Sequence, residues 1–243
     1  MTPNLVVVPT YNEIENIESL IDTVFGLDAD FDILVVDDGS PDGTALKVRE
    51  LMERHPGMLH LEQRTEKSGL GTAYIHGFKW ALARNYAYIF EMDADFSHDP
   101  KDLPRLLEAC RDRGNDIAVG SRYKTGVNVV NWPISRVLLS LGASFYVRLI
   151  TGMKVYDPTA GFVCYRREVL ERINLDRIQF VGYAFQIEMK YKAHLLGFKI
   201  EEVTVVFTDR VKGESKMNTK IIWEAIFGVI SMKIKSVFKK LEI

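Results

Sequence analysis

YIFEMDADFSHDP, residues 88–100, begins with apolar side chains of the kind that fill a buried strand and then turns acidic. Asp93 and Asp95 are two residues apart, so both carboxylates point the same way if the chain stays extended. Like charges this close repel unless a cation lies between them, and carboxylates with phosphate oxygens suit Mg²⁺ or Mn²⁺. We therefore expect Asp93 and Asp95 to hold a divalent metal. The alternative is a polar turn in which Ser97 or Asp99 caps the next helix.

Short apolar runs alternate with amphipathic helical patterns on both sides of this stretch. Strands are expected at residues 4–9, 31–36, 59–63, 88–92, 116–121, 161–166 and 199–207. Helices are expected at 12–25, 44–54, 72–84, 103–113, 134–149, 185–196 and 221–243, the first with Asn12 and Glu15 as a capping pair. Such alternation predicts an α/β domain with a mainly parallel sheet flanked by helices.

A second acidic pair, Asp37 and Asp38, ends the second expected strand. In parallel sheets ligands bind beyond the carboxyl ends of the strands, so both acidic pairs and the loop at residues 11–13 should share one edge. The alternative for residues 37–40 is a simple turn, since Asp, Gly and Ser all favour turns.

The composition limits the class of protein. The chain has 243 residues, 47% of them hydrophobic and 26% charged, which suits one domain at 1–218 with an amphipathic helical appendage at 219–243. A net charge of −2 argues against a general nucleic-acid-binding surface. The two cysteines, Cys110 and Cys164, are expected to be buried free thiols in a reducing compartment. No signal peptide and no uninterrupted apolar run of 18 residues is found, so no segment is expected to span a membrane.

Two tracts are apolar and basic. No acid occurs between Asp116 and Asp157, and residues 212–243 contain seven lysines and three glutamates. Amphipathic helices at 134–149 and at the C-terminus are therefore expected to touch an anionic membrane surface, with the protein peripheral on the cytoplasmic face. The alternatives are a core helix for the first tract, and packing on its own domain or on a dimer partner for the second.

Several motifs together resemble a known family. They are VVVPTYNE (6–13), VVDDGSPDGT (35–44), DADFSHDP (93–100), GSRY (120–123) and DRVKGESKM (209–217). With them the chain resembles the family 2 glycosyltransferases, whose fold is the Rossmann-like GT-A fold. The last motif and GYAFQIEM (182–189) narrow the resemblance to the polyprenol-phosphate (dolichol-phosphate) mannose synthases.

The resemblance implies roles for individual residues. The residues expected to bind the nucleotide-sugar donor are Pro9, Tyr11, Glu13, Val36, Asp38, Asp93, Ala94, Asp95, Arg210 and Lys216. Those expected to bind the acceptor phosphate are Arg122, Arg210 and Ser215. Asp93 and Asp95 are the expected metal ligands and, with Arg122, the expected catalytic residues. Some relatives have Gln where this chain has Ser97, and direct metal coordination by Ser97 is not expected. Arg122 taken alone has a second interpretation, an ordinary solvated cation, and Arg210 and Lys216 could likewise be ordinary surface charges.

The implied reaction is inverting transfer of mannose from GDP-mannose to a polyprenyl phosphate, which gives a β-linked product from an α-linked donor. The metal would neutralise the leaving diphosphate. A phosphate acceptor is anionic already near neutral pH, so the site should contain cations and no required general base. The alternatives are another nucleotide sugar such as UDP-glucose on the same lipid, a nucleotidyltransferase, and a non-catalytic membrane-tethered nucleotide-sugar binder. The sequence leaves open a membrane partner subunit.

Overall fold

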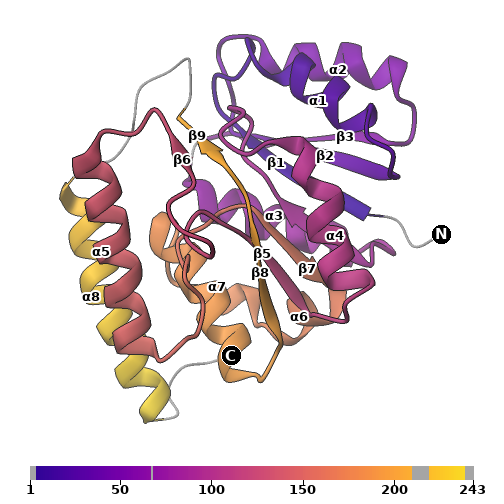
Figure 1. Ribbon diagram of the computed structural model, residues 1–243. Helices are drawn as coiled ribbons and strands as arrows, with labels where there is room; N and C mark the ends of the chain where they lie inside the picture. Colours follow the sequence, from indigo (N-terminus) through magenta and orange to yellow (C-terminus); the bar gives the residue numbers. More distant parts are fainter. Residues whose placement is uncertain (1–3, 67, 210–218, 239–243) are drawn as a thin grey trace.

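A seven-stranded sheet forms the centre of the computed structural model, which describes residues 4–66, 68–209 and 219–238 (Figure 1). Its strands are β1 (Asn4–Thr10), β2 (Phe31–Asp37), β3 (Leu59–Gln63), β4 (Tyr88–Glu91), β5 (Ile117–Ser121), β7 (Val163–Arg166) and β8 (Ile200–Thr204). The spatial order is β3-β2-β1-β4-β7-β5-β8, and β7 alone in this sheet runs antiparallel to its neighbours. The predicted mainly parallel α/β sheet is confirmed.

Helices cover both faces of the sheet. One face packs against α1 (Ile17–Phe25), α2 (Thr44–Arg54) and α4 (Leu103–Arg111). The other packs against α3 (Leu70–Leu82), α6 (Arg167–Arg172) and α7 (Tyr183–Leu195). Val6 and Val8 of β1 enter the first core and Leu5 and Val7 the second, all fully buried. Coverage on both sides explains why this strand is continuously apolar rather than alternating.

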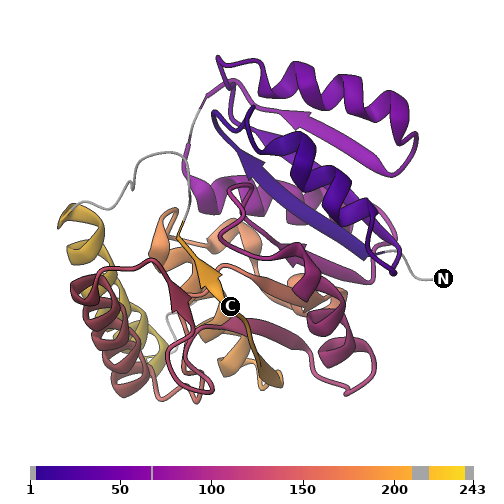
Figure 2. The ribbon, with the colours of Figure 1, turned by 45° about the horizontal axis from the view of Figure 1, so that its top comes forward.

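Two long helices lie side by side at one margin of the molecule, α5 (Ile134–Thr151) and α8 (Thr219–Val237) (Figures 1 and 2). They pack with α7 through a small third core that contains Val147, Tyr191 and Val229. Among the described residues α5 is the one helix whose length and composition would let it cross a membrane. From the sequence no segment was expected to span a membrane, because the chain has no uninterrupted apolar run of 18 residues; Arg136 and Arg148 interrupt the run in α5. Helices of this kind also serve as core helices of soluble proteins.

The remaining elements are short. A two-residue parallel ladder joins β6 (Val129–Val130) to β9 (Phe207–Thr208), and two 3₁₀ turns lie at Pro100–Asp102 and Leu175–Arg177. The strand predicted at 199–207 is therefore divided into β8 and β9. Both cysteines are free and buried, as expected.

The predicted start of the first helix is wrong. Helix α1 begins at Ile17, and Asn12 has a left-handed backbone with a φ of 61°. The amides that would begin a helix bond instead to the loop after β2: Asn12 to Ser40 Oγ, Glu13 to Thr44 Oγ1 and Ile14 to Asp42 Oδ2. These tertiary bonds replace the predicted local cap, and they join the loops of two neighbouring strands.

Candidate active site

Asp37 fastens the turn that follows β2. Its Oδ1 accepts hydrogen bonds from the hydroxyls of Thr10 at 3.0 Å and Ser40 at 2.5 Å, and its Oδ2 accepts one from the Ser40 amide at 2.9 Å. The Asp37 side chain is fully buried. For this residue the turn interpretation holds, because its carboxylate is used to hold the loop.

Asp38 forms an ion pair with Arg64, a residue that the sequence analysis did not single out. Arg64 Nε and Nη2 donate to the two carboxylate oxygens at 2.6 and 2.8 Å, and Nη1 donates to Thr72 Oγ1 at 2.9 Å. Arg64 comes directly after β3. A basic residue at the carboxyl end of an expected strand was the feature of the sequence that could have identified it as a site residue. A contact between Asp38 and a base or ribose stays a prediction, and it would have to coexist with this ion pair.

The turn that carries Asp93 and Asp95 is held from two sides. Tyr74, fully buried on α3, donates its hydroxyl to Asp93 Oδ1 at 3.2 Å. Asp95 Oδ1 accepts the Ser97 amide at 3.0 Å, across Phe96 with its φ of 58°. A positive φ is unusual for a bulky residue and marks a backbone fixed by its surroundings. Both carboxylates are half-buried at the end of β4.

His98 supports the same turn. The Asp93 amide donates to His98 Nδ1 at 3.2 Å, and the ring stacks on Phe162 with centroids 5.0 Å apart. Burial lowers the pKa of His98, which favours the neutral ring. Because Nδ1 accepts a hydrogen bond, the proton of the neutral ring lies on Nε2. From the sequence, a capping or surface histidine was favoured over a histidine that extends the metal site, and His98 is instead buried.

The acidic turn fits a metal that is held mainly by a substrate. Among residues 4–66, 68–209 and 219–238, no group of three or more His, Cys, Asp or Glu side chains could hold a metal ion. Asp93 and Asp95 therefore offer two hard oxygen donors. Mg²⁺ commonly binds through one or two carboxylates, with phosphates and water as the remaining ligands. The donor set suits such an ion on a diphosphate.

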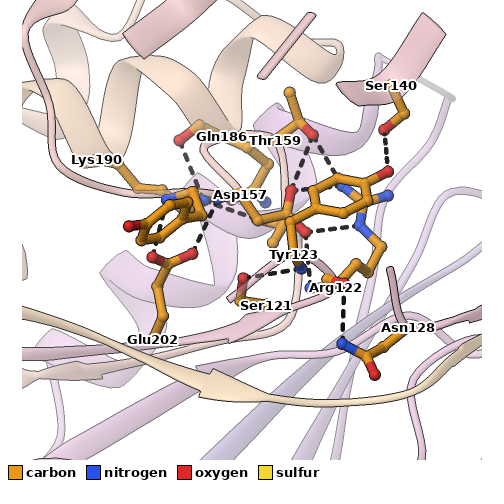
Figure 3. Close-up of polar contacts among 12 residues, drawn as sticks. Ser121, Arg122, Tyr123, Asn128, Ser140, Asp157, Thr159, Gln186, Lys190 and Glu202 are labelled. Atoms are coloured by element: carbon orange, nitrogen blue, oxygen red, sulfur yellow. Dashed lines mark hydrogen bonds and ion pairs between the residues drawn. The ribbon is translucent and has the colours of Figure 1, made fainter. Parts of the chain in front are cut away.

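Arg122 is clamped rather than solvated (Figure 3). Its Nε donates to Asp157 Oδ2 at 2.7 Å, and its Nη2 donates to Asp157 Oδ1 at 2.6 Å and to Thr159 Oγ1 at 2.8 Å. Burial alone would raise the pKa of Asp157, but the charge and hydrogen bonds of Arg122 outweigh burial and lower it. The Arg122 side chain is 11% exposed, so the interpretation as an ordinary solvated cation is wrong.

A layer of buried polar side chains lies behind Arg122 and Asp157 (Figure 3). Lys190 Nζ donates to the Ala160 carbonyl at 2.7 Å and to Gln186 Oε1 at 3.0 Å, and Gln186 Nε2 donates to Glu91 Oε2 at 2.5 Å. Burial lowers the pKa of Lys190 and raises that of Glu91, and the attraction between the two charges opposes both shifts. Helix α7 thus connects the strand before Asp93 with the loop that holds Arg122.

A cavity of about 580 Å³ opens between the acidic turn and helices α5, α7 and α8. From the turn it is lined by Asp93, Ser97 and His98, and from the polar side by Arg122, Trp132, Arg136 and Ser140. Its apolar lining includes Leu138, Leu139, Val147, Ile187 and Ile226. One cavity is therefore lined by the Asp93 carboxylate, by two guanidinium groups and by an apolar wall.

The model of the family described as glycosyl transferase family 2 matches this chain over residues 5–173. The chain belongs to this family. This family 2 glycosyltransferase is 47% identical over 231 residues to a polyprenol monophosphomannose synthase of Mycolicibacterium smegmatis, covering 95% of this chain and 87% of that protein. It is 44% identical over 225 residues to an undecaprenyl-phosphate mannosyltransferase of Micrococcus luteus, covering 93% of this chain and 91% of that one.

A solved structure shares the fold of the glycosyltransferase. The mannosyltransferase PcManGT from Pyrobaculum calidifontis, in complex with GDP-Man and Mn²⁺, superposes with a TM-score of 0.61 at 20% identity. The match covers 97% of this chain but 64% of that one. At this identity the likeness establishes the GT-A-type fold and no more.

The predicted site residues divide into four sets. Asp93 and Arg122 line the cavity. Asp95 on the same turn does not, nor do Pro9, Tyr11, Glu13 and Asp38 at the ends of β1 and β2. The side chains of Val36 and Ala94 are buried in the core, so a donor contact from either would have to use its main chain. The remaining predicted residues, Arg210, Ser215 and Lys216, lie outside the described residues.

Proposed function

We propose that this glycosyltransferase moves mannose from GDP-mannose to a polyprenyl phosphate, with inversion at the anomeric carbon. The names of the two relatives support the sugar and the class of acceptor. The donor would occupy the edge formed by the loops after β1 and β2, near Tyr11, Glu13 and Asp38. Its diphosphate would extend toward Asp93 and Asp95.

The observation that carries this proposal is the mixed lining of the cavity. A lipid phosphate needs cations for its head group and apolar surface for the first part of its chain. Arg122 and Arg136 offer the cations, and Leu138, Leu139 and Val147 of α5 offer the apolar wall. Asp93 belongs to the same lining, so an acceptor phosphate held there would lie beside the donor diphosphate.

The chain's own residues would bind and orient the two substrates. Asp157 and Thr159 fix the direction of the Arg122 guanidinium, and Tyr74 and His98 fix the turn at Asp93. A phosphate oxygen attacks without losing a proton first, so no general base is assigned. A bound Mg²⁺ or Mn²⁺ would stabilise the leaving diphosphate as a Lewis acid. The Mn²⁺ and GDP-Man of the similar structure support this assignment.

The protein would lie on the cytoplasmic face of a membrane as a peripheral protein. Exposed apolar side chains outside the cavity lining lie on α5 and α8 and directly after α8: Ile134, Phe145, Leu149, Phe227, Ile234, Val237 and Phe238. The arginines of α5 do not serve this surface, since Arg136 lines the cavity and Arg148 stacks on Tyr156. In this proposal residues 1–218 are the transferase domain, and 219–243 are a helical appendage that helps it contact lipid.

A donor panel tests the function directly. Purified protein receives labelled GDP- and UDP-sugars, Mn²⁺ or Mg²⁺, and polyprenyl phosphate in vesicles, and label that enters the organic phase is measured. We expect label from GDP-mannose alone, and cleavage of the product by a β-specific mannosidase. Label from another sugar, or an α-linked product, would overturn the corresponding part of the proposal. Activity of the purified chain by itself would show that no membrane partner subunit is needed.

A further inference from the structure

Trp132 stands between the two arginines of the cavity. The guanidinium carbon of Arg136 lies 4.0 Å from the centroid of the Trp132 ring system, and that of Arg122 lies 5.5 Å from it. Phe207 packs edge-on against the same indole at 5.3 Å. A guanidinium that stacks on an aromatic ring keeps the N–H groups at its edge available for an anion. The indole thus contacts both cations without using any of their N–H groups.

The position of Trp132 is set by its neighbours in the chain. Asn131, just before it, has a left-handed backbone with a φ of 63°, which Asn tolerates better than most residues. The Asp209 amide donates to the Val130 carbonyl at 3.1 Å, and Asp209 Oδ2 accepts from Arg136 Nη1 at 2.8 Å. Arg136 is therefore held by Asp209 and by the indole face, and the ring cannot move without disturbing it.

One atom of this ring is without a partner. Trp132 Nε1 is buried and has no hydrogen-bond acceptor among the described residues. A buried N–H group that forms no hydrogen bond loses the bond it would make to water, which makes such groups rare in native proteins. Trp132 belongs to the lining of the cavity, together with Arg122 and Arg136. An anionic ligand in the cavity would supply the missing acceptor.

We propose that Trp132 Nε1 donates a hydrogen bond to an oxygen of the acceptor phosphate while the indole face positions Arg136. The inference rests on the proposed function, because it takes a phosphate acceptor in this cavity as given. The donor diphosphate is a less suitable partner: of the described residues expected to bind the donor, Asp93 shares this lining, whereas Tyr11, Glu13 and Asp38 at the ends of β1 and β2 do not. Trp132 is then specific for the acceptor.

The test is Trp132→Phe, which keeps an aromatic face for the arginines and removes the N–H group together with part of the indole ring system. We expect the KM for polyprenyl phosphate to rise about tenfold, as for loss of a hydrogen bond to a charged group, with the KM for GDP-mannose unchanged. The equilibrium Kd for polyprenyl phosphate, measured without donor, should rise by the same factor. Trp132→Leu removes the aromatic face as well and should raise the acceptor KM further.

Trp80→Phe is the matched control. Trp80 Nε1 donates to Glu62 Oε1 at 3.1 Å, and Trp80 does not belong to the cavity lining. This variant loses an indole hydrogen bond elsewhere, so both KM values should stay at the wild-type level.

The outcomes separate the two proposals. If the wild-type protein transfers no mannose to polyprenyl phosphate, the proposed function fails. If the wild-type protein is active and Trp132→Phe leaves the acceptor KM and Kd unchanged, the assignment of Nε1 is overturned. Equal increases in both KM values would also overturn it, because they would indicate a general distortion of the site.

Discussion

Arg122 and Asp157 form a two-point ion pair in which Nε and Nη2 of the guanidinium reach both carboxylate oxygens, at 2.7 and 2.6 Å. Asp157 is fully buried, and its own amide donates to Glu202 Oε1 at 2.9 Å. The arginine follows β5, whereas its partner lies 35 residues later in the loop before β7. The Arg122 guanidinium is thus held in a fixed direction by a side chain of the protein itself.

Asp157→Asn should weaken both stability and acceptor binding. It removes the charge that balances Arg122, and breaking a buried pair from one side typically costs about 3 kcal/mol of unfolding free energy. The KM for polyprenyl phosphate should rise more than that for GDP-mannose, since Arg122 would lose its fixed direction. Urea unfolding and steady-state kinetics measure the two effects. Asp112→Asn is the control, because its pair with Arg111 is exposed and should add nothing measurable. Equal unfolding midpoints for both variants would contradict the prediction.

Asp93→Asn and Asp95→Asn should each lower kcat about 100-fold or more, because each removes a charged oxygen from the expected metal site. A chelator should abolish activity in the wild-type protein, and added Mn²⁺ or Mg²⁺ should restore it. Asp99→Asn serves as the control: Asp99 is exposed, and its Oδ1 accepts the Lys101 amide at the start of a 3₁₀ turn. Unchanged product formation in both site variants would leave a non-catalytic binder, or another site, as the better account.

The fold and the site edge could be predicted because both rest on local patterns. Apolar runs of strand length and helical periodicity gave the alternating elements, and parallel strands bring Asp38 and Asp93 to the same edge. The start of α1 could not be predicted, since it depends on bonds from the Asn12 loop to Ser40 and its neighbours. Local propensity favoured a cap there, and tertiary contacts decided otherwise.

The partners of the site residues were not visible in the sequence. Arg64 reaches Asp38 across 26 residues, Tyr74 reaches Asp93 across 19, and Gln186 reaches Glu91 across 95. No spacing rule joins residues at such separations, and a single sequence carries no information on which residues vary together. The motifs predict which side chains belong to the site, and the fold determines what holds those that the structure describes.

Gly77→Ala should destabilise the protein by about 1–3 kcal/mol, because overpacking forces neighbouring atoms to move. A Cβ at Gly77 of α3 would lie 2.4 Å from Val7 Cγ1 of β1. Gly142→Ala in α5 is the matched control: no atom lies within 4 Å of its Cβ position, and Ala favours helix by up to about 1 kcal/mol. Thermal unfolding should therefore shift in opposite directions, and equal shifts would contradict the packing of α3 on β1.

Lys190→Met should lower the unfolding free energy by about 3 kcal/mol, because the fully buried Glu91 would lose its counter-charge. The double variant Glu91→Gln with Lys190→Met should recover most of that loss, since neither charge is then left alone. Lys79→Met, which breaks an exposed pair with Asp176, should change little. Urea unfolding of the wild type, Lys190→Met, Glu91→Gln and the double variant gives the coupling. Strictly additive effects would show that the two buried charges do not interact.

Phe145→Ser should weaken binding to vesicles that contain anionic lipid. Phe145 is 65% exposed on the outer surface of α5, and burying a phenyl group in lipid contributes about 1.5–3 kcal/mol, so the partition coefficient should fall about tenfold or more. Leu46→Ser is the matched control, because Leu46 is 64% exposed but lies on α2, which covers the sheet. Flotation with vesicles measures the partition coefficient of each variant.

Activity toward a short, water-soluble polyprenyl phosphate should be the same in both variants, since neither Phe145 nor Leu46 lines the cavity. An equal loss of vesicle binding in the two variants would remove α5 from the membrane contact, because apolar exposure anywhere on the molecule would then explain the binding.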